Sequence, residues 1–230
     1  MEPRLHYIYD PLCGWCYAAS ALVRTAREIM PVVAHGGGML AGPYRKQITP
    51  ELREHILSND SQIAKLTGQP FGERYFKGLL EDQSVWFDSE PPTTAVLAAE
   101  QMGGRGLDML ARLQMAHYVD GLRIGETSTL LDLSAELGLD RETFAAALNT
   151  EHKHTVQHFS ESRELLAKVG ARGFPTFILE HQGILQRLDH TPFLSNPLGW
   201  QRALEVAQGP KLATRSAADG TGCTHDGCAL

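Results

Sequence analysis

The chain has 230 residues and a formal net charge of −6 at pH 7, with 43% hydrophobic and 21% charged residues. This composition is typical of a globular protein that builds its own hydrophobic core. The acidic balance argues against nucleic acid as a partner, because phosphate recognition depends on clustered lysine and arginine. No segment approaches the roughly 18 to 20 apolar residues that cross a bilayer, so we expect no membrane partner.

The cysteines fall in two close pairs, Cys13 with Cys16 and Cys223 with Cys228. The sequence begins without the basic and apolar segments of a secretory signal, which predicts a cytoplasmic location, or a periplasmic one if a signal was removed. The cytosol keeps most thiols reduced. Close cysteine pairs in such a chain indicate redox or metal chemistry rather than a disulfide scaffold.

Residues 1–48 predict a β–α–β unit. The run from Leu5 to Tyr9 is rich in strand-forming residues. Apolar residues then recur at helical spacing from Gly14 to Met30, and Pro31 ends that pattern. A second strand is expected over 32–35, before three consecutive glycines. Two parallel strands need such a helical crossover.

Residues 49–148 predict an inserted helical subdomain. Thr49 and Pro50 form a helix start, with the threonine as N-cap and the proline in the first turn. Further helices are expected from Pro91 and over 107–120, 129–137 and 140–148, the last capped by Asp140. No β-rich pattern interrupts this block, so we expect it to be mostly helical and to be inserted into an α/β core.

The α/β pattern returns over residues 149–208. A helix over 151–169 ends at Gly170, two strands follow over 173–179 and 183–188, and a helix over 198–207 closes the unit. Residues 209–230 are small and polar, which predicts a flexible tail that carries Cys223 and Cys228. The expected fold is therefore an α/β core interrupted by a large helical subdomain.

Cys13 and Cys16 lie between the first strand and the first turn of the next helix. Free N–H groups and the helix dipole favour the thiolate at Cys13, whereas Cys16 should be more buried and less ionised. Their spacing places both sulfurs on one helix face. We predict that Cys13 attacks a substrate disulfide and that Cys16 resolves the mixed disulfide. Half of a zinc site is the alternative interpretation of the pair.

Three other positions extend this candidate site. A cis Phe174–Pro175 bond beside Cys13 would present its backbone to an extended substrate, and Phe174 and Thr176 are predicted to bind that substrate. Trp15 is expected either to offer an apolar surface to polypeptide or to be a core aromatic residue. Asp10 is expected either to relay a proton during exchange or to cap the turn before the helix.

The segment Tyr9-Asp10-Pro11-Leu12-Cys13-Gly14-Trp15-Cys16, the helical insertion and Gly173-Phe174-Pro175-Thr176-Phe177 together resemble the DsbA family, and within it the FrnE-like branch of predicted protein-disulfide isomerases. The resemblance covers about residues 5–208. It implies a thioredoxin fold with a helical insertion and disulfide oxidoreductase or isomerase activity. It also implies Cys13 as nucleophile, Cys16 as resolving thiol and Pro175 as the cis proline. Gly14 stands where many relatives carry proline, which affects the redox potential rather than the chemistry.

The tail cysteines allow a second redox step. Some FrnE-like proteins are similar in carrying such a C-x4-C pair. The linker over 209–222 would span roughly 20 Å as a coil and about 45 Å when extended, so the tail can reach the first pair. We hypothesise an electron relay between Cys13–Cys16 and Cys223–Cys228. An inert tail, or a soft-metal clip formed with His225, are the alternatives.

The expected partners are polypeptide thiols and disulfides, together with a reductant such as thioredoxin or glutathione. Neither a cofactor nor a metal is expected. A glutathione-dependent isomerase or kappa-type transferase is an alternative function, although such enzymes typically use serine at the position of Cys13. Soft-metal binding through all four thiols is a second alternative.

Overall fold

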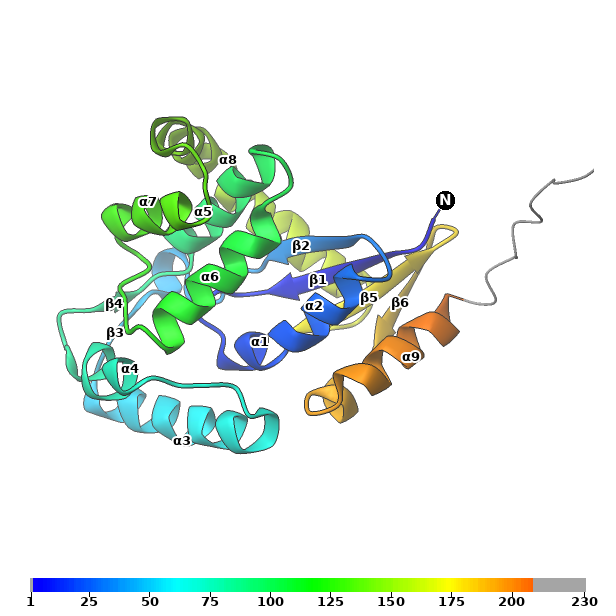
Figure 1. Cartoon of the computed structure of the whole chain (residues 1–230), viewed down its shortest axis with the longest axis horizontal. Coiled ribbons are helices and arrows are strands. Elements are labelled where there is room, and N and C mark those ends of the chain that lie inside the picture. Colours follow the sequence, from blue (N-terminus) through cyan, green and yellow to red (C-terminus); the bar gives the residue numbers. More distant parts are fainter. Residues whose placement is uncertain (1, 209–230) are drawn as a thin grey trace, which may run out of the picture.

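The computed structural model of the chain describes residues 2–208, and a four-stranded mixed sheet forms its core (Figure 1). The strands are β1 (Arg4–Tyr9), β2 (Val32–Gly36), β5 (Thr176–His181) and β6 (Ile184–Leu188), in the order β2-β1-β5-β6. β2 runs parallel to β1, whereas β5 is antiparallel to both β1 and β6. The pairing of β1 with β5 brings the first cysteine pair and the late proline motif to one end of the sheet.

Helices provide most of the remaining structure. α1 (Gly14–Ala18) and α2 (Ser20–Arg27) connect β1 to β2. The segment between β2 and β5 contains α3 (Pro50–Thr67), α4 (Glu73–Lys77), α5 (Glu90–Gln101), α6 (Gly106–Tyr118), α7 (Thr127–Glu136) and α8 (Arg141–Lys168). α9 (Pro197–Ala207) follows β6, and short 3-10 turns are η1 (Gly42–Tyr44), η2 (Leu79–Glu81) and η3 (Thr191–Phe193).

The two faces of the sheet bury different cores, because alternate strand residues point to opposite sides. Tyr7 stacks on Phe177, whose ring lies 5.2 Å from that of Trp200 in α9. These aromatic residues belong to the main core together with residues of α2, α5 and α6. Ile8 packs on the other face in a separate cluster with Leu166 of α8. The sheet therefore lies between the α2–α9 pair and α8.

Several local predictions are confirmed. The Thr49 hydroxyl accepts a hydrogen bond from the Leu52 N–H at 3.2 Å, and the Asp140 carboxylate accepts one from the Thr143 N–H at 2.9 Å, so both residues cap their helices. Gly170 ends α8 at a φ of 66°. Thr49 and Asp140 supply the acceptor that a free N–H group at a helix start requires. Gly170 adopts the left-handed backbone angle that ends a helix.

Other local predictions are wrong. The helix expected over 14–30 is divided at Ala19 and ends at Arg27. The block expected to be mostly helical, with no β-rich pattern, contains β4 (Trp86–Phe87), which pairs with β3 (Lys46–Gln47). Strands of two residues are too short to show a period. The helices expected over 140–148 and 151–169 form the single helix α8, because no glycine or proline separates them, so the expected boundary at 148 falls inside α8.

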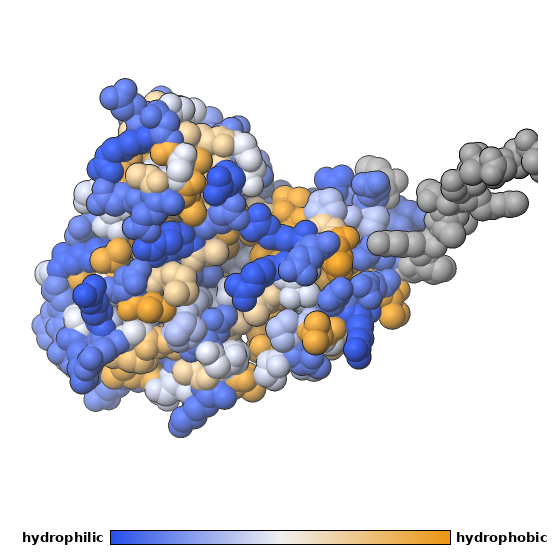
Figure 2. Space-filling view, viewed as in Figure 1, coloured by the Kyte–Doolittle hydropathy of each residue, from blue (hydrophilic) through white to orange (hydrophobic). Residues whose placement is uncertain are grey.

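None of the helices in residues 2–208 is long and apolar enough to span a membrane. On the face shown in Figure 2, hydrophobic surface occurs in patches between hydrophilic regions. Cys223 and Cys228 lie outside the described residues, so the proposed relay and the metal clip stay predictions.

Candidate active site

The two cysteines of the first pair occupy the start of α1. Cys13 is the N-cap residue, and its sulfur accepts a hydrogen bond from the Cys16 N–H at 3.3 Å. Both residues carry free thiols in this structure. Cys13 keeps 6% of its surface exposed, whereas Cys16 keeps none. The sulfur at the mouth of the helix is therefore the one that a substrate can reach.

Cys16 lies in a protected environment. The backbone N–H of Asp10 donates to its sulfur at 3.5 Å, and the Tyr7 hydroxyl donates to its backbone carbonyl at 3.0 Å. Burial raises the pKa of Cys16 well above its ordinary value, and the hydrogen bond with Cys13 raises it further. The prediction that Cys16 is more buried than Cys13 is confirmed, whereas the prediction that it is less ionised than Cys13 stays a prediction.

The late proline motif lies directly against the first cysteine. The Phe174–Pro175 peptide bond is cis, as predicted. The Cys13 thiol donates to the Phe174 carbonyl at 3.7 Å, although the two residues are 161 positions apart. The Thr176 hydroxyl donates to the Gly173 carbonyl at 2.8 Å and so braces the loop. The predicted contacts of Phe174 and Thr176 with substrate stay predictions.

Three consecutive glycines at the end of β2 permit close packing against α5, α8 and the Phe174 ring. A Cβ atom on Gly37 would lie 2.0 Å from a ring carbon of Phe174, and one on Gly36 would lie 2.4 Å from a methyl carbon of Thr93. Gly38 has a φ of 62°, which lies in the left-handed region. Gly37 therefore lets the end of β2 pack against the ring that precedes the cis proline.

Asp10 holds the active-site turn in place. Its buried carboxylate accepts hydrogen bonds from the Leu12 N–H at 2.9 Å, the Ser89 hydroxyl at 2.9 Å and the Met39 N–H at 2.6 Å. Burial raises the pKa of Asp10, and these hydrogen bonds act in the opposite direction. The capping role is confirmed, whereas the proton relay stays a prediction, because only the backbone of Asp10 makes a described hydrogen bond to Cys16.

A cavity of about 430 Å³ opens beside Cys13 between α1, α3 and α6. Half-buried Trp15 contributes to its wall, and the exposed side chain of Tyr44 lies at its edge. The wall is largely apolar, with a few polar groups deep inside, as in many small-molecule sites. The other lining residues are Leu12, Gly14, Met39, Leu40, Lys46, Leu52, His55, Ile56, Asn59, Asp60, Ile63, Tyr75, Phe87, His117 and Tyr118.

Asp60 of α3 is a functional candidate that the sequence analysis missed. The Tyr75 hydroxyl donates to its Oδ2 at 2.8 Å, and burial raises the pKa of Asp60 to about 6. Its Oδ1 would lie 2.7 Å from a Cβ atom at position 14, so this close approach depends on Gly14. The available signal was an acidic residue between Ile56 and Ile63, on the apolar stripe of the helix.

Two residues at the end of α6 were also missed. The Tyr118 ring stacks on Tyr17, with ring centroids 4.7 Å apart. The buried Tyr118 hydroxyl has no hydrogen-bond partner within residues 2–208. Burial lowers the pKa of His117 to about 3, so its imidazole is neutral at pH 7. α6 is apolar over most of its surface, which hid both residues from pattern analysis.

The opposite face of the sheet carries a histidine row that ends at the glycine turn. The His6 ring contacts His35 at 2.9 Å and the Glu180 carboxylate at 3.0 Å. His158 of α8 accepts a hydrogen bond from the Gly36 N–H at 2.9 Å. Burial lowers the pKa of His35 to about 3, and the neighbouring histidines act in the same direction. His35, in the middle of the row, is therefore neutral at pH 7. His158, at the end of the row, is hydrogen-bonded to Gly36, the neighbour of Gly37.

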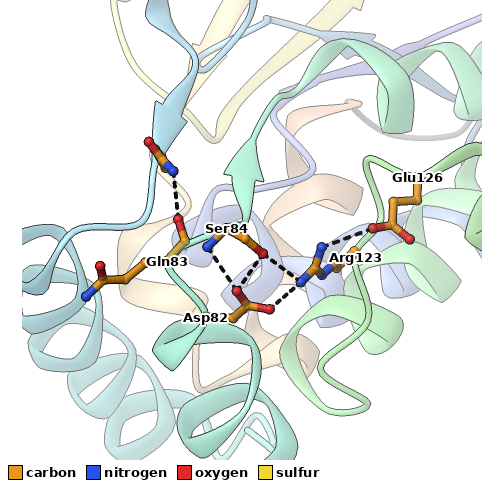
Figure 3. Close-up of polar contacts among 6 residues, drawn as sticks. Asp82, Gln83, Ser84, Arg123 and Glu126 are labelled. Carbon is orange, nitrogen blue, oxygen red and sulfur yellow. Dashed lines mark hydrogen bonds and ion pairs between the residues drawn. The ribbon is translucent and has the colours of Figure 1, made fainter.

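An ionic network lies within the helical subdomain, between the segments 82–84 and 123–126. The Arg123 guanidinium contacts Asp82, the Ser84 hydroxyl and the Glu126 carboxylate (Figure 3). These residues join the segment before β4 to the segment before α7. Ser84, Arg123 and Glu126 also line a second cavity of about 280 Å³, which shares Leu12, Phe87 and His117 with the cavity beside Cys13.

Comparisons with known proteins agree with this geometry. A family model described as a DSBA-like thioredoxin domain matches residues 77–196. The cytosolic disulfide reductase DsbM from Pseudomonas aeruginosa is 51% identical, with 89% of this chain and 98% of DsbM covered and a TM-score of 0.84. DsbM with GSH gives 49% identity over the same shares and a TM-score of 0.82.

A putative protein disulfide isomerase from Nitrosomonas europaea shares the fold at 22% identity, with 91% of this chain and 100% of that protein covered and a TM-score of 0.75. Comparison with curated protein sequences gives no match.

Proposed function

The chain belongs to the DsbA-like thioredoxin family and is a thiol–disulfide oxidoreductase, and we propose that it reduces disulfides through Cys13 with glutathione as the electron donor. The observation that carries this proposal is the position of the Cys13 sulfur, which lies between the start of α1 and the Phe174 carbonyl. The similar DsbM is described as a cytosolic disulfide reductase, and a structure of it contains GSH. We infer the same direction, reductant and compartment for this chain.

The chemistry consists of successive exchanges of one disulfide for another. The Cys13 thiolate attacks a substrate disulfide, so that one S–S bond forms, one breaks and a substrate thiolate leaves. Cys16 then attacks the Cys13 sulfur, releases the second substrate thiol and leaves a Cys13–Cys16 disulfide. Two glutathione thiols restore the dithiol and become oxidised glutathione, so two electrons pass from glutathione to substrate.

The structure supports different roles for the two sulfurs. Cys16 has no exposed surface, and burial raises its pKa, so it is poorly suited to attack an external substrate. Cys13 lies beside the 430 Å³ cavity and the half-buried Trp15. A polypeptide that lies along the Phe174 carbonyl would place its disulfide next to the Cys13 sulfur.

A coupled assay tests this function. The purified chain is given glutathione, glutathione reductase, NADPH and a polypeptide disulfide such as insulin, and NADPH oxidation is followed. We expect enzyme-dependent turnover, and we expect the Cys13→Ser variant to lose it. The Cys223→Ser/Cys228→Ser variant tests the relay, because unchanged turnover in that variant would contradict it. Glutathione-independent turnover, or full activity in Cys13→Ser, would overturn the proposed function.

A further inference from the structure

The cavity beside Cys13 contains a carboxylate that the sulfur contacts do not use. Asp60 is the one acidic residue among the residues that line this cavity, and it lies against Gly14, the neighbour of Cys13. Only 4% of its surface is exposed. An ionisable group in so protected a place needs a reason, because removing a carboxylate from water is unfavourable.

The two oxygens of Asp60 have different surroundings. Oδ2 accepts the hydrogen bond from Tyr75, whereas no residue in 2–208 donates a side-chain hydrogen bond to Oδ1. Oδ1 is the oxygen that approaches Gly14, at a distance that any side chain at position 14 would obstruct. The buried Tyr118 hydroxyl, which is also without a partner there, lines the same cavity. Oδ1 is therefore an acceptor without a side-chain donor in this part of the chain, and it lies against the residue next to Cys13.

We propose that Asp60 is the general base that takes the proton from the thiol that opens the Cys13–Cys16 disulfide. This inference rests on the proposed function, in which glutathione reduces the Cys13–Cys16 disulfide, and it adds that the glutathione thiol approaches from the cavity. Oδ1 is the carboxylate oxygen that lies against Gly14, the neighbour of Cys13, so we assign it the proton of a thiol that attacks the Cys13 sulfur from the cavity. The Tyr75 hydroxyl holds the carboxylate in this orientation.

The proposed step is balanced. The incoming thiol gives its proton to Asp60, its sulfur forms a bond to the Cys13 sulfur, and the Cys13–Cys16 bond breaks. The bonding electron pair stays on Cys16, which leaves as a thiolate. Burial raises the pKa of Cys16, so the thiolate then takes up a proton, and Asp60 returns to the carboxylate. Neither an additional oxidant nor an additional reductant is needed.

The size of the expected gain follows from thiol ionisation. A thiol with an ordinary pKa of about 8.5 is only about 3% thiolate at pH 7, and the thiolate is the attacking form. A base that accepts the proton during attack makes the remaining thiol usable, which allows a gain of up to roughly 30-fold at pH 7. At pH 9 most of the thiol is already ionised, so the gain falls below about twofold.

Other titratable groups face Asp60 from each element around the cavity. Burial raises the pKa values of Tyr75 and Tyr118 well above the ordinary range and lowers that of His117 to about 3, so all three stay neutral between pH 5 and 9. Histidine side chains ordinarily titrate in this interval, so His55 requires its own control. The remaining groups that line the cavity are Cys13, Tyr44 and Lys46.

The test measures how fast glutathione opens the Cys13–Cys16 disulfide in the oxidised full-length chain. Reactions between pH 5 and 9 are quenched with acid, alkylated and analysed by mass spectrometry of the peptide that holds both cysteines. In the native chain we expect a rate that rises above pH 6 and exceeds the rate in Asp60→Asn by about tenfold at pH 7. We expect the two rates to differ by less than twofold at pH 9.

The controls separate this role from a structural one. Glu54→Gln, at an exposed position of the same helix and outside the cavity lining, should keep the native profile. His55→Gln should keep the rise in rate above pH 6 even if the overall rate changes, because His55 lines the cavity. An equal loss in Asp60→Asn at every pH would overturn the proposal, because a structural defect does not depend on thiol ionisation. A native rate proportional to the thiolate concentration from pH 5 to 8 would also overturn it, even if Asp60→Asn failed to fold. No opening by glutathione at any pH would instead overturn the proposed function.

Discussion

The two sides of the cysteine site are constructed differently. The core wall consists of Cys13, Cys16 and Phe174, which are held mainly by backbone contacts at the end of the sheet. The helical wall consists of Asp60 and Tyr118, whose side chains come from α3 and α6. The thioredoxin core positions the Cys13 sulfur, whereas the inserted helices carry Asp60, the proposed proton acceptor. Changes in the core wall should therefore abolish exchange, whereas changes in the helical wall should adjust its rate.

Replacing Cys16 with alanine should give the largest effect. Cys13 can still attack, but the internal thiol that resolves the mixed disulfide is gone. An internal thiol acts at an effective concentration far above that of an external one, so turnover of a polypeptide disulfide should fall on the order of 100-fold or more. Mass spectrometry should detect a 1:1 mixed disulfide at Cys13. Normal turnover without that adduct would show that Cys16 is not the resolving thiol.

Gly37→Ala should also damage the core wall without touching either sulfur. The new Cβ atom would lie 2.0 Å from the Phe174 ring, so the ring and the carbonyl beside Cys13 must move. Misplacement of a reacting group by about 1 Å can reduce rates on the order of 100-fold, so we expect a 10- to 100-fold loss in kcat/KM. Gly125→Ala is the matched control, because its Cβ atom would meet open space. Equal activities for the two variants would refute the supporting role of the glycine turn.

The core wall was largely predictable from the sequence. Cys13 and Cys16 are close in the chain, and the β–turn–α pattern around them has local signals. Pro175 lies far away, but its motif begins a strand, and the fold implied by the resemblance brings that strand beside β1. The position of the cis bond therefore followed from a short motif combined with a known strand order.

The helical wall could not be predicted in the same way. Asp60 becomes a site residue only because α3 packs on α1 at Gly14, and helix packing leaves no mark in a local pattern. The two-residue strands β3 and β4 have no measurable period. The sequence predicts two helices in place of the continuous α8, because the first apolar pattern ends near residue 148 as it would at a helix end. Contacts distant in sequence decide the position of Asp60 and the pairing of β3 with β4, whereas the continuity of α8 follows from the absence of a glycine or proline between its two halves.

Acid should lower the free energy of unfolding, because protonation of His35 is unfavourable in the folded chain. Its pKa is about 3 in the folded chain, against about 6.5 when unfolded, so the unfolded chain binds more protons between these values. The stability that neutral His35 provides is present above pH 6.5 and is lost as pH falls towards 3, by on the order of 4 to 5 kcal/mol. Urea unfolding at several pH values measures this loss. A His35→Gln variant should lose less stability, and an unchanged pH slope would contradict the assignment.

Asp60 should produce the opposite pH dependence on the helical wall. Its pKa is about 6 when folded and about 3.9 when unfolded, so the folded chain favours the protonated form. Ionised Asp60 therefore reduces stability at pH 7, and Asp60→Asn should raise the free energy of unfolding by about 1 to 2 kcal/mol there. The advantage should disappear by pH 4. A variant that is less stable than the native chain at pH 7 would show that the carboxylate is a structural anchor.

Arg123→Ala should give the smallest effect, because it removes exposed ion pairs at the edge of the helical subdomain (Figure 3). Exposed pairs contribute little to stability, since water and salt screen them. We expect the glutathione reaction at Cys13 to change by less than twofold. Arg123 lines the neighbouring cavity, so any measurable change should appear in KM for a polypeptide disulfide.

Arg141→Ala provides the control, because it removes an exposed pair with Asp132 outside both cavities. A tenfold loss in the glutathione reaction of Arg123→Ala alone would contradict the division between the two walls. The ionic network would then have to control the position of the sulfur, rather than only the surface over which a polypeptide approaches it.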